Sequence, residues 1–208
     1  SNPHEFQGIA SERITAFRRA LGKVSALRTQ LTRWVLVRVP NSAFAQQAGM
    51  STEEMMEFFF NATLLDWQEE RVRYEAIQKV LQASERIRIV GRDTDLSFTT
   101  TGRKYVIDDG HINMPGGEIY TAPLDNSAEG HIAFEFPAVF AGQFIEGIRL
   151  RFFAGEVVEA HADKNEKLLK ELIAMDEGAK RIGEFGVGTN FGVESGSYTQ
   201  HDFAVTYD

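Results

Sequence analysis

The sequence contains no cysteine among its 208 residues. Disulfide bonds and thiolate catalysis are therefore excluded as sources of stability or activity. Proteins that remain in a reducing compartment commonly lack disulfides. We accordingly expect a cytoplasmic protein.

Long apolar runs and an excess of positive charge are also missing. No stretch has the roughly 18 consecutive apolar residues of a membrane-spanning helix, and the first residues show no signal-peptide pattern. The formal net charge is −8 at pH 7, whereas nucleic-acid surfaces need clustered lysine and arginine to neutralise phosphates. Neither a membrane nor a nucleic acid is expected as a partner.

Several catalytic motifs are absent as well. The sequence has no Gly-x-Ser-x-Gly elbow, no phosphate-binding loop and no His-Glu-x-x-His pattern. Serine hydrolases, nucleotide-binding proteins and zincin-type peptidases depend on those motifs for their chemistry. The sequence therefore does not support any of these three classes.

Apolar residues are plentiful, with sixteen phenylalanines, and their spacing changes near residue 85. Before that point the spacing is helical, apart from one apolar run that predicts a buried strand. After it apolar and polar residues alternate, which is typical of strands. The predicted helices span residues 11–32, 51 onward, 66–84 and 164–175, and the predicted strands 34–39, 87–90, 96–99, 132–136, 145–152 and 156–159.

This pattern predicts an α+β fold, in which a helical first part leads into a mostly antiparallel β region with one further helix. We expect residues 1–85 to form a helical part with one strand. Residues 86–208 should form a β-rich domain, to which the candidate site residues below belong. A single continuous domain is the alternative.

Two short segments each present one carboxylate beside glycine. In His111–Pro123 (HINMPGGEIYTAP), Glu118 follows a Pro-Gly-Gly turn and precedes a β-prone run. In Asp176–Glu184 (DEGAKRIGE), Glu184 directly follows a glycine. Because glycine admits backbone conformations closed to other residues, such a bend can aim an acidic side chain inward. Each glutamate is either a ligand or base presented by its turn, or a solvated surface residue.

These segments resemble, in their order along the chain, the thermophilic-type metallo-aminopeptidases of peptidase family M29. The resemblance extends from about Arg33 to about Asn190, and it includes the runs VPN at 39–41, AQQAGM at 45–50, GRDTDLSF at 91–98 and FFAGEVV at 152–158. It implies an aminopeptidase that removes the first residue of peptides with a free N-terminus through a metal-activated water. It also implies two divalent ions (zinc, cobalt or magnesium) and a homodimer.

The same resemblance assigns metal-ligand roles to Glu118 and Glu184, which are 184 − 118 = 66 residues apart. Only the tertiary fold could bring them together. Further family ligands are a histidine in a His-x-Ala-x-Gly-like strand, a tyrosine, and a His-x-Asp motif. Here that strand is absent. Asp202 matches the end of the His-x-Asp motif if Gln200 replaces the histidine; alternatively His201 is the ligand in a register shifted by one. Both are candidates, and Tyr198 is a weaker one.

The resemblance also implies that the chain has about half the length of a family member. A fragment, a chain with segments missing and a natural short form are the three explanations. Loss of the histidine ligands would instead leave a non-catalytic binding or dimerisation module on the same scaffold, which is the alternative function.

The sequence supports only weaker predictions for several other aspartates and histidines. Asp93 and Asp95 are two apart on a predicted strand and would share a face, as an acidic patch or as solvated residues. His111 is expected to shape the loop before Glu118. His131 and His161 are interpreted as structural.

Overall fold

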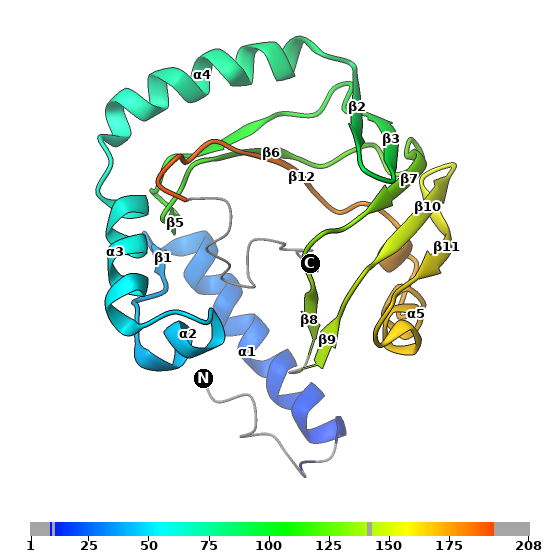
Figure 1. Ribbon diagram of the computed structural model, residues 1–208, viewed down its shortest axis with the longest axis horizontal. Coiled ribbons are helices and arrows are strands. Elements are labelled where there is room, and N and C mark those ends of the chain that lie inside the picture. The colour runs from blue at the N-terminus through cyan, green and yellow to red at the C-terminus, as the bar shows by residue number, and fades with distance from the viewer. Residues whose placement is uncertain (1–8, 10, 141–142, 194–208) are drawn as a thin grey trace.

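The computed structural model describes residues 9, 11–140 and 143–193, and it has helices first and strands afterwards (Figure 1). The predicted α+β class is confirmed. The helices are α1 (Ser11–Leu31), α2 (Ser42–Gln47), α3 (Thr52–Thr63), α4 (Trp67–Ala83), α5 (Glu166–Ile173) and the 3₁₀ helix η1 (Gly178–Lys180). The strands are β1 (Leu36–Val37), β2 (Arg86–Gly91), β3 (Thr94–Thr99), β4 (Val106–Asp108), β5 (Asn113–Met114), β6 (Glu118–Thr121), β7 (Glu129–Ala133), β8 (Ala138–Phe140), β9 (Gln143–Ile145), β10 (Arg149–Phe153), β11 (Glu156–His161) and β12 (Phe185–Gly188).

Side-chain caps set the first residues of α3 and α4. The Ser51 hydroxyl accepts a hydrogen bond from the backbone N–H of Glu54, and the Glu54 carboxylate accepts one from the N–H of Ser51. This reciprocal pair satisfies N–H groups that have no partner within the helix. Asp66 accepts in the same way from two N–H groups of the first turn of α4. The helices predicted from 51 and 66 are confirmed.

The prediction for residues 34–39 is wrong in both length and burial. Strand β1 comprises only Leu36 and Val37, which are 50% and 37% exposed. It pairs in parallel with β5 in a two-stranded sheet. Two short strands bury little apolar surface between them, so apolar composition alone did not produce a core strand here.

Helix α1 also leaves its apolar stripe in solvent. Leu21, Val24, Leu27 and Leu31 are all at least 49% exposed. The helix itself was predicted from their spacing, which is confirmed. Among the described residues no helix is both long enough and apolar enough to cross a membrane.

A five-stranded antiparallel sheet in the order β11-β10-β7-β3-β2 holds the core built from Leu96, Phe98, Ala128 and Phe152. The hairpin predicted between β10 and β11 is confirmed, with Ala154 and Gly155 both at positive φ in its turn. Helix α5 lies against β11 and β9 (Figure 1) and buries two leucines of the predicted apolar side, Leu169 and Leu172.

The single strand predicted at 145–152 is wrong, because a bend at Gly147 interrupts it. Strand β9 ends at Ile145 and β10 begins at Arg149. Between them Gly147 has φ +64, and a Cβ at this residue would overlap with the Asp163 side chain. Only glycine fits such a conformation and such a close approach. The alternation of apolar and polar residues continues on both sides of the bend, so the sequence pattern gave no sign of it.

A three-stranded sheet, in the order β12-β6-β4, positions the candidate site. Helix α4 lies across one face of it (Figure 1), where Tyr74 of the helix packs with Tyr105 and Ile119. Ile107 and Phe185 add to this apolar layer. Strand side chains alternate between faces. Residues beside Ile107, Ile119 and Phe185 in sequence therefore point away from α4.

The buried side of α4 was only partly predicted. Ile77 and Leu81 pack against the core as expected. Val72 and Val80, which were assigned to the same side, are 70% and 68% exposed. The helix is turned so that Tyr74, fully buried, faces the sheet instead. The predicted domain boundary at residue 85 stays a prediction.

Replacing Ile119 with valine tests the apolar layer under α4. Ile119 is fully buried, so loss of one methylene should lower the free energy of unfolding by about 1 kcal/mol. Ile112→Val is the matched control, because Ile112 is 49% exposed. Urea denaturation of both variants checks the difference, and equal stabilities would contradict the assigned packing.

Candidate metal-binding site

Pairing of β6 with β12 brings Glu118 and Glu184 to the same face of the sheet. The two strands are antiparallel, with Val187 opposite Ile119 and Gly188 opposite Glu118. Ile119 faces α4, so its neighbour Glu118 lies on the other face. Glu184 directly precedes β12, and the same alternation places it on that face too. Two carboxylates that are distant in sequence thus share one surface.

The Glu118 side chain lies across β12. It passes directly over Gly186, where any Cβ would overlap with the Glu118 carboxylate. Since Gly188 is the residue opposite Glu118, this side chain leans along the strand in the direction of Glu184. Gly186 provides the room for that orientation.

Tyr120 and Asp108 belong to the same surface. Tyr120 is two residues beyond Glu118, and Asp108 of β4 lies opposite Glu118 on its other side. Burial raises the pKa of the Tyr120 hydroxyl, and the negative charges of Glu184, Asp108 and Glu118 raise this pKa further. Tyr120 therefore keeps its proton at neutral pH and stands among three carboxyl groups.

Sequence reasoning missed both of these residues. The alternation in Glu-Ile-Tyr-Thr could have placed Tyr120 beside Glu118, since residues i and i+2 of a strand share a face. No comparable signal existed for Asp108, because its position depends on the pairing of β4 with β6.

Asp108 also organises the loop that leads to Glu118. Its carboxylate accepts hydrogen bonds from the Asn113 amide at 3.2 Å and from the Gly110 N–H at 3.3 Å. Asp108 is only 9% exposed, and burial raises the pKa of its carboxyl group. The carbonyl oxygen of Asp108 accepts from the N–H of Gly117 at 2.7 Å. Asp108 thus joins the loop at 109–113 to the Pro-Gly-Gly turn.

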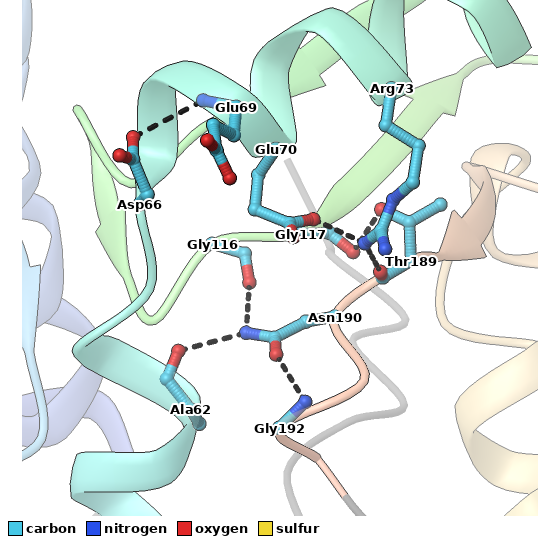
Figure 2. Close-up of polar contacts among 10 residues, drawn as sticks. All are labelled: Ala62, Asp66, Glu69, Glu70, Arg73, Gly116, Gly117, Thr189, Asn190 and Gly192. Atoms are coloured by element: carbon cyan, nitrogen blue, oxygen red, sulfur yellow. Dashed lines mark hydrogen bonds and ion pairs between the residues drawn. The ribbon is translucent and has the colours of Figure 1, made fainter.

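The Pro-Gly-Gly turn before Glu118 is held from its other side by the end of β12. The N–H and the hydroxyl of Thr189 both donate to the carbonyl oxygen of Gly117, at 2.6 and 2.8 Å. Figure 2 shows Thr189 and Asn190 beside the two glycines of the turn. Gly117 has φ +108, and the Met114–Pro115 peptide bond is cis. The backbone that presents Glu118 is therefore anchored on both sides.

Carboxylate and phenol oxygens suit hard or borderline divalent cations, so the side chains gathered here fit a metal ion in their chemistry. Within residues 9, 11–140 and 143–193, no three or more histidine, aspartate or glutamate side chains form a group that could hold a metal. The other predicted ligands, His201 and Asp202, and the weaker candidate Tyr198 lie outside the described residues.

His111 has the loop-shaping position that was expected. Its Nδ1 lies 2.6 Å from one carboxylate oxygen of Asp109, and Arg71 of α4 pairs with the other. His131 lies within β7 and His161 at the end of β11, where its Nδ1 is 3.5 Å from Glu166.

The prediction that Asp93 and Asp95 share a strand face is wrong. Asp93 lies in the turn between β2 and β3, with φ +49, because a two-residue hairpin turn needs this conformation. Asp95 is on β3, where its carboxylate pairs with Arg88 at 2.7 Å. The two residues form no common acidic patch.

Asp109→Asn should destabilise the protein in a pH-dependent manner. Burial by itself raises the pKa of Asp109, but the hydrogen bonds and positive charges of His111 and Arg71 outweigh it and hold this pKa below the ordinary value of 3.8. A lowered carboxyl pKa stabilises the fold above the unfolded-state pKa, and that stabilisation disappears as pH falls through the folded-state pKa. We expect a loss of about 1 kcal/mol at pH 7.

Urea denaturation at pH 7 and at pH 3 measures this effect. The difference between Asp109→Asn and the wild type should shrink at the lower pH. A difference that is equal at both values would argue against an ionised Asp109 in the folded state.

The sequence matches the family described as thermophilic metalloprotease (M29) over residues 1–200, and the chain belongs to this family. It is 28% identical over 213 residues to aminopeptidase T of Thermus aquaticus, covering 88% of this chain and 52% of that protein. Aminopeptidase AmpS of Bacillus subtilis (strain 168) is 29% identical over 214 residues, with the same two shares.

Comparison with solved structures agrees with the comparison of sequences. The chain is similar to wild-type AmpT from Thermus thermophilus with a TM-score of 0.73 and 27% identity, covering 90% of this chain and 53% of that one. The chain thus spans about half the length of the curated relatives it matches. This confirms the family and the expectation that the chain has about half the length of a family member. Membership of a metalloprotease family implies the use of a divalent metal.

Proposed function

We propose that the protein is a metal-dependent aminopeptidase that releases N-terminal residues from peptides. Glu118 and Glu184 are the metal ligands from this part of the chain, and His201 and Asp202 are the candidates for further ligands. The observation that carries the proposal is the sheet pairing that brings the two glutamates to one face. Chains named as aminopeptidases that match over 88% of the sequence support the reaction class.

The proposed site holds two divalent ions (zinc, cobalt or magnesium), which would supply a polarised scissile carbonyl and a water of lowered pKa. Glu118 and Glu184 contribute negative charge, which attracts the cations and balances them. The Tyr120 hydroxyl lies beside these carboxylates. Selectivity for a free N-terminus follows if the α-amine of the peptide occupies this acidic surface.

The proposal extends to the setting of the enzyme. A homodimer and a cytoplasmic location are predicted from the family resemblance and the cysteine-free composition. Size-exclusion chromatography with light scattering checks the first of these predictions. A monomer at micromolar concentration would contradict it.

Hydrolysis of leucine-p-nitroanilide by the whole protein tests the reaction. We expect release of p-nitroaniline after addition of cobalt or zinc, and loss of this activity after a chelator. Metal content per protomer should be measured on the same samples. Stoichiometric metal without any turnover on a panel of aminoacyl-p-nitroanilides would argue against an aminopeptidase.

A non-catalytic binding or dimerisation module is the second candidate. It is favoured by the finding that no complete group of metal-ligating side chains occurs within the described part of the chain. The two candidates differ in metal content. A protein that stays free of metal after incubation with cobalt or zinc would support the module.

A further inference from the structure

The side chain of Asn190 joins three separate segments of the chain next to the proposed metal site. Its amide nitrogen donates to the carbonyl oxygen of Ala62 and to that of Gly116, both at 2.9 Å. Its amide oxygen accepts from the N–H of Gly192 at 2.8 Å. Figure 2 shows these contacts converging on the one amide group. The last turn of α3 and the Pro-Gly-Gly turn are thereby tied to the end of β12.

The backbone around Asn190 is packed as closely as its side chain. A Cβ on Gly117 would overlap with the Cβ of Asn190. Thr189, which is 7% exposed, donates twice to the Gly117 carbonyl oxygen. Arg73 of α4 donates to the Thr189 carbonyl oxygen at 2.7 Å and is paired with Glu70 (Figure 2). Helices α3 and α4 thus both contact this strand end.

The position of Glu118 depends on these contacts. The carbonyl groups of Gly116 and Gly117 are the last two before Glu118, and Asn190 and Thr189 hold one each. With these two peptide groups held, the backbone at Glu118 is fixed before its own strand begins. Loss of a group that orients a metal ligand typically lowers metal affinity by about 10- to 100-fold.

Asparagine suits this position because of its hydrogen-bonding groups. One amide provides two N–H donors for two carbonyl oxygens and one acceptor for an N–H. An aspartate would offer no donor, and a serine would offer only one. The three contacts observed here use all of these functions at once.

We infer that Asn190, supported by Thr189, is a positioning residue for the metal site: it fixes the turn before Glu118 and thereby sets the metal affinity. This inference rests on the proposed function, since it requires Glu118 to be a ligand. Asn190 would act through the turn before Glu118, because its side chain hydrogen-bonds only to backbone groups.

Cobalt titration of the whole protein, followed by the visible absorption of the bound ion, tests the inference. Asn190→Ala should weaken Co²⁺ binding by about 10- to 100-fold and change the shape of the absorption band. Thr189→Val, which keeps the side-chain shape but removes the hydroxyl donor, should weaken binding to a smaller extent. Thr189→Ser keeps the donor and should restore the wild-type affinity and band.

Asn41→Ala is the matched control. Asn41 caps α2 by accepting from two backbone N–H groups, so its loss lowers stability through a comparable number of hydrogen bonds outside the site. Its cobalt affinity and band should equal those of the wild type. Thermal denaturation of the metal-free variants provides the stability comparison.

Three outcomes would contradict the inference in different ways. Unchanged cobalt affinity and band in Asn190→Ala and Thr189→Val, whatever their stability, would reduce these residues to a structural role and leave the proposed function intact. If Asn190→Ala fails to fold, equal affinities of Thr189→Val and Thr189→Ser would overturn the inference. A wild-type protein that binds no cobalt would overturn both the proposed function and the inference.

Discussion

Replacing Glu184 with glutamine should abolish metal-dependent peptide hydrolysis while leaving the fold intact. Glutamine has nearly the size of glutamate but carries no charge and binds divalent cations poorly. Glu184 lies on the sheet face turned away from α4, so no apolar packing is lost. We expect kcat/KM for leucine-p-nitroanilide to fall by at least about 100-fold and the zinc content per protomer to fall with it.

Glu177→Gln serves as the control for this experiment. Glu177 directly precedes η1 in the same segment, and its side chain is 86% exposed with Lys180 as its partner at 3.5 Å. It should retain wild-type activity and metal content. A metal-replete, fully active Glu184→Gln variant would remove Glu184 from the set of ligands.

Gly117→Ala should lower the stability of the protein more than an average surface substitution does. Gly117 has φ +108, a conformation that is strained for any residue with a Cβ, and the new methyl group would overlap with Asn190. We expect a loss of about 3 kcal/mol in the free energy of unfolding, or roughly 10 °C in Tm. Differential scanning calorimetry of the metal-free protein measures it.

Gly188→Ala is the comparison for this second prediction. Gly188 lies on β12, close to the same turn, but a Cβ at Gly188 would have no atom within 4 Å. Its Tm should stay within about 2 °C of the wild type. Equal losses in both variants would mean that the turn does not need glycine at position 117.

The secondary structure of the chain was largely predictable wherever local chemistry controls it. The capping residues Ser51 and Asp66 begin α3 and α4 because a side-chain oxygen satisfies N–H groups two or three residues away. Burial was less predictable. Val80 of α4 and Leu36 of β1 are apolar and exposed, because burial depends on which element packs against each face. Spacing within one element carries no information about its neighbours.

The candidate site was also predictable only in part from the sequence. The motifs identified the family and singled out Glu118 and Glu184, since the Pro-Gly-Gly turn before Glu118 and the glycine before Glu184 are recognisable in short stretches of sequence. Their assignment as ligands stays a proposal, as do His201 and Asp202. The turn before Glu118 was recognised from its glycines, but the residues that hold it were not.

The sequence by itself determined the α+β class, the capping box of α3 and the family, and it singled out the two glutamates as candidates, because each of these features is recorded in residues close together along the chain. Only the tertiary structure decided that the two glutamates share a face with Asp108 and Tyr120, and that Asn190 reaches the turn before Glu118. Those relations join residues up to 76 positions apart (184 − 108 = 76). They follow from strand register and packing, which depend on the whole folded chain.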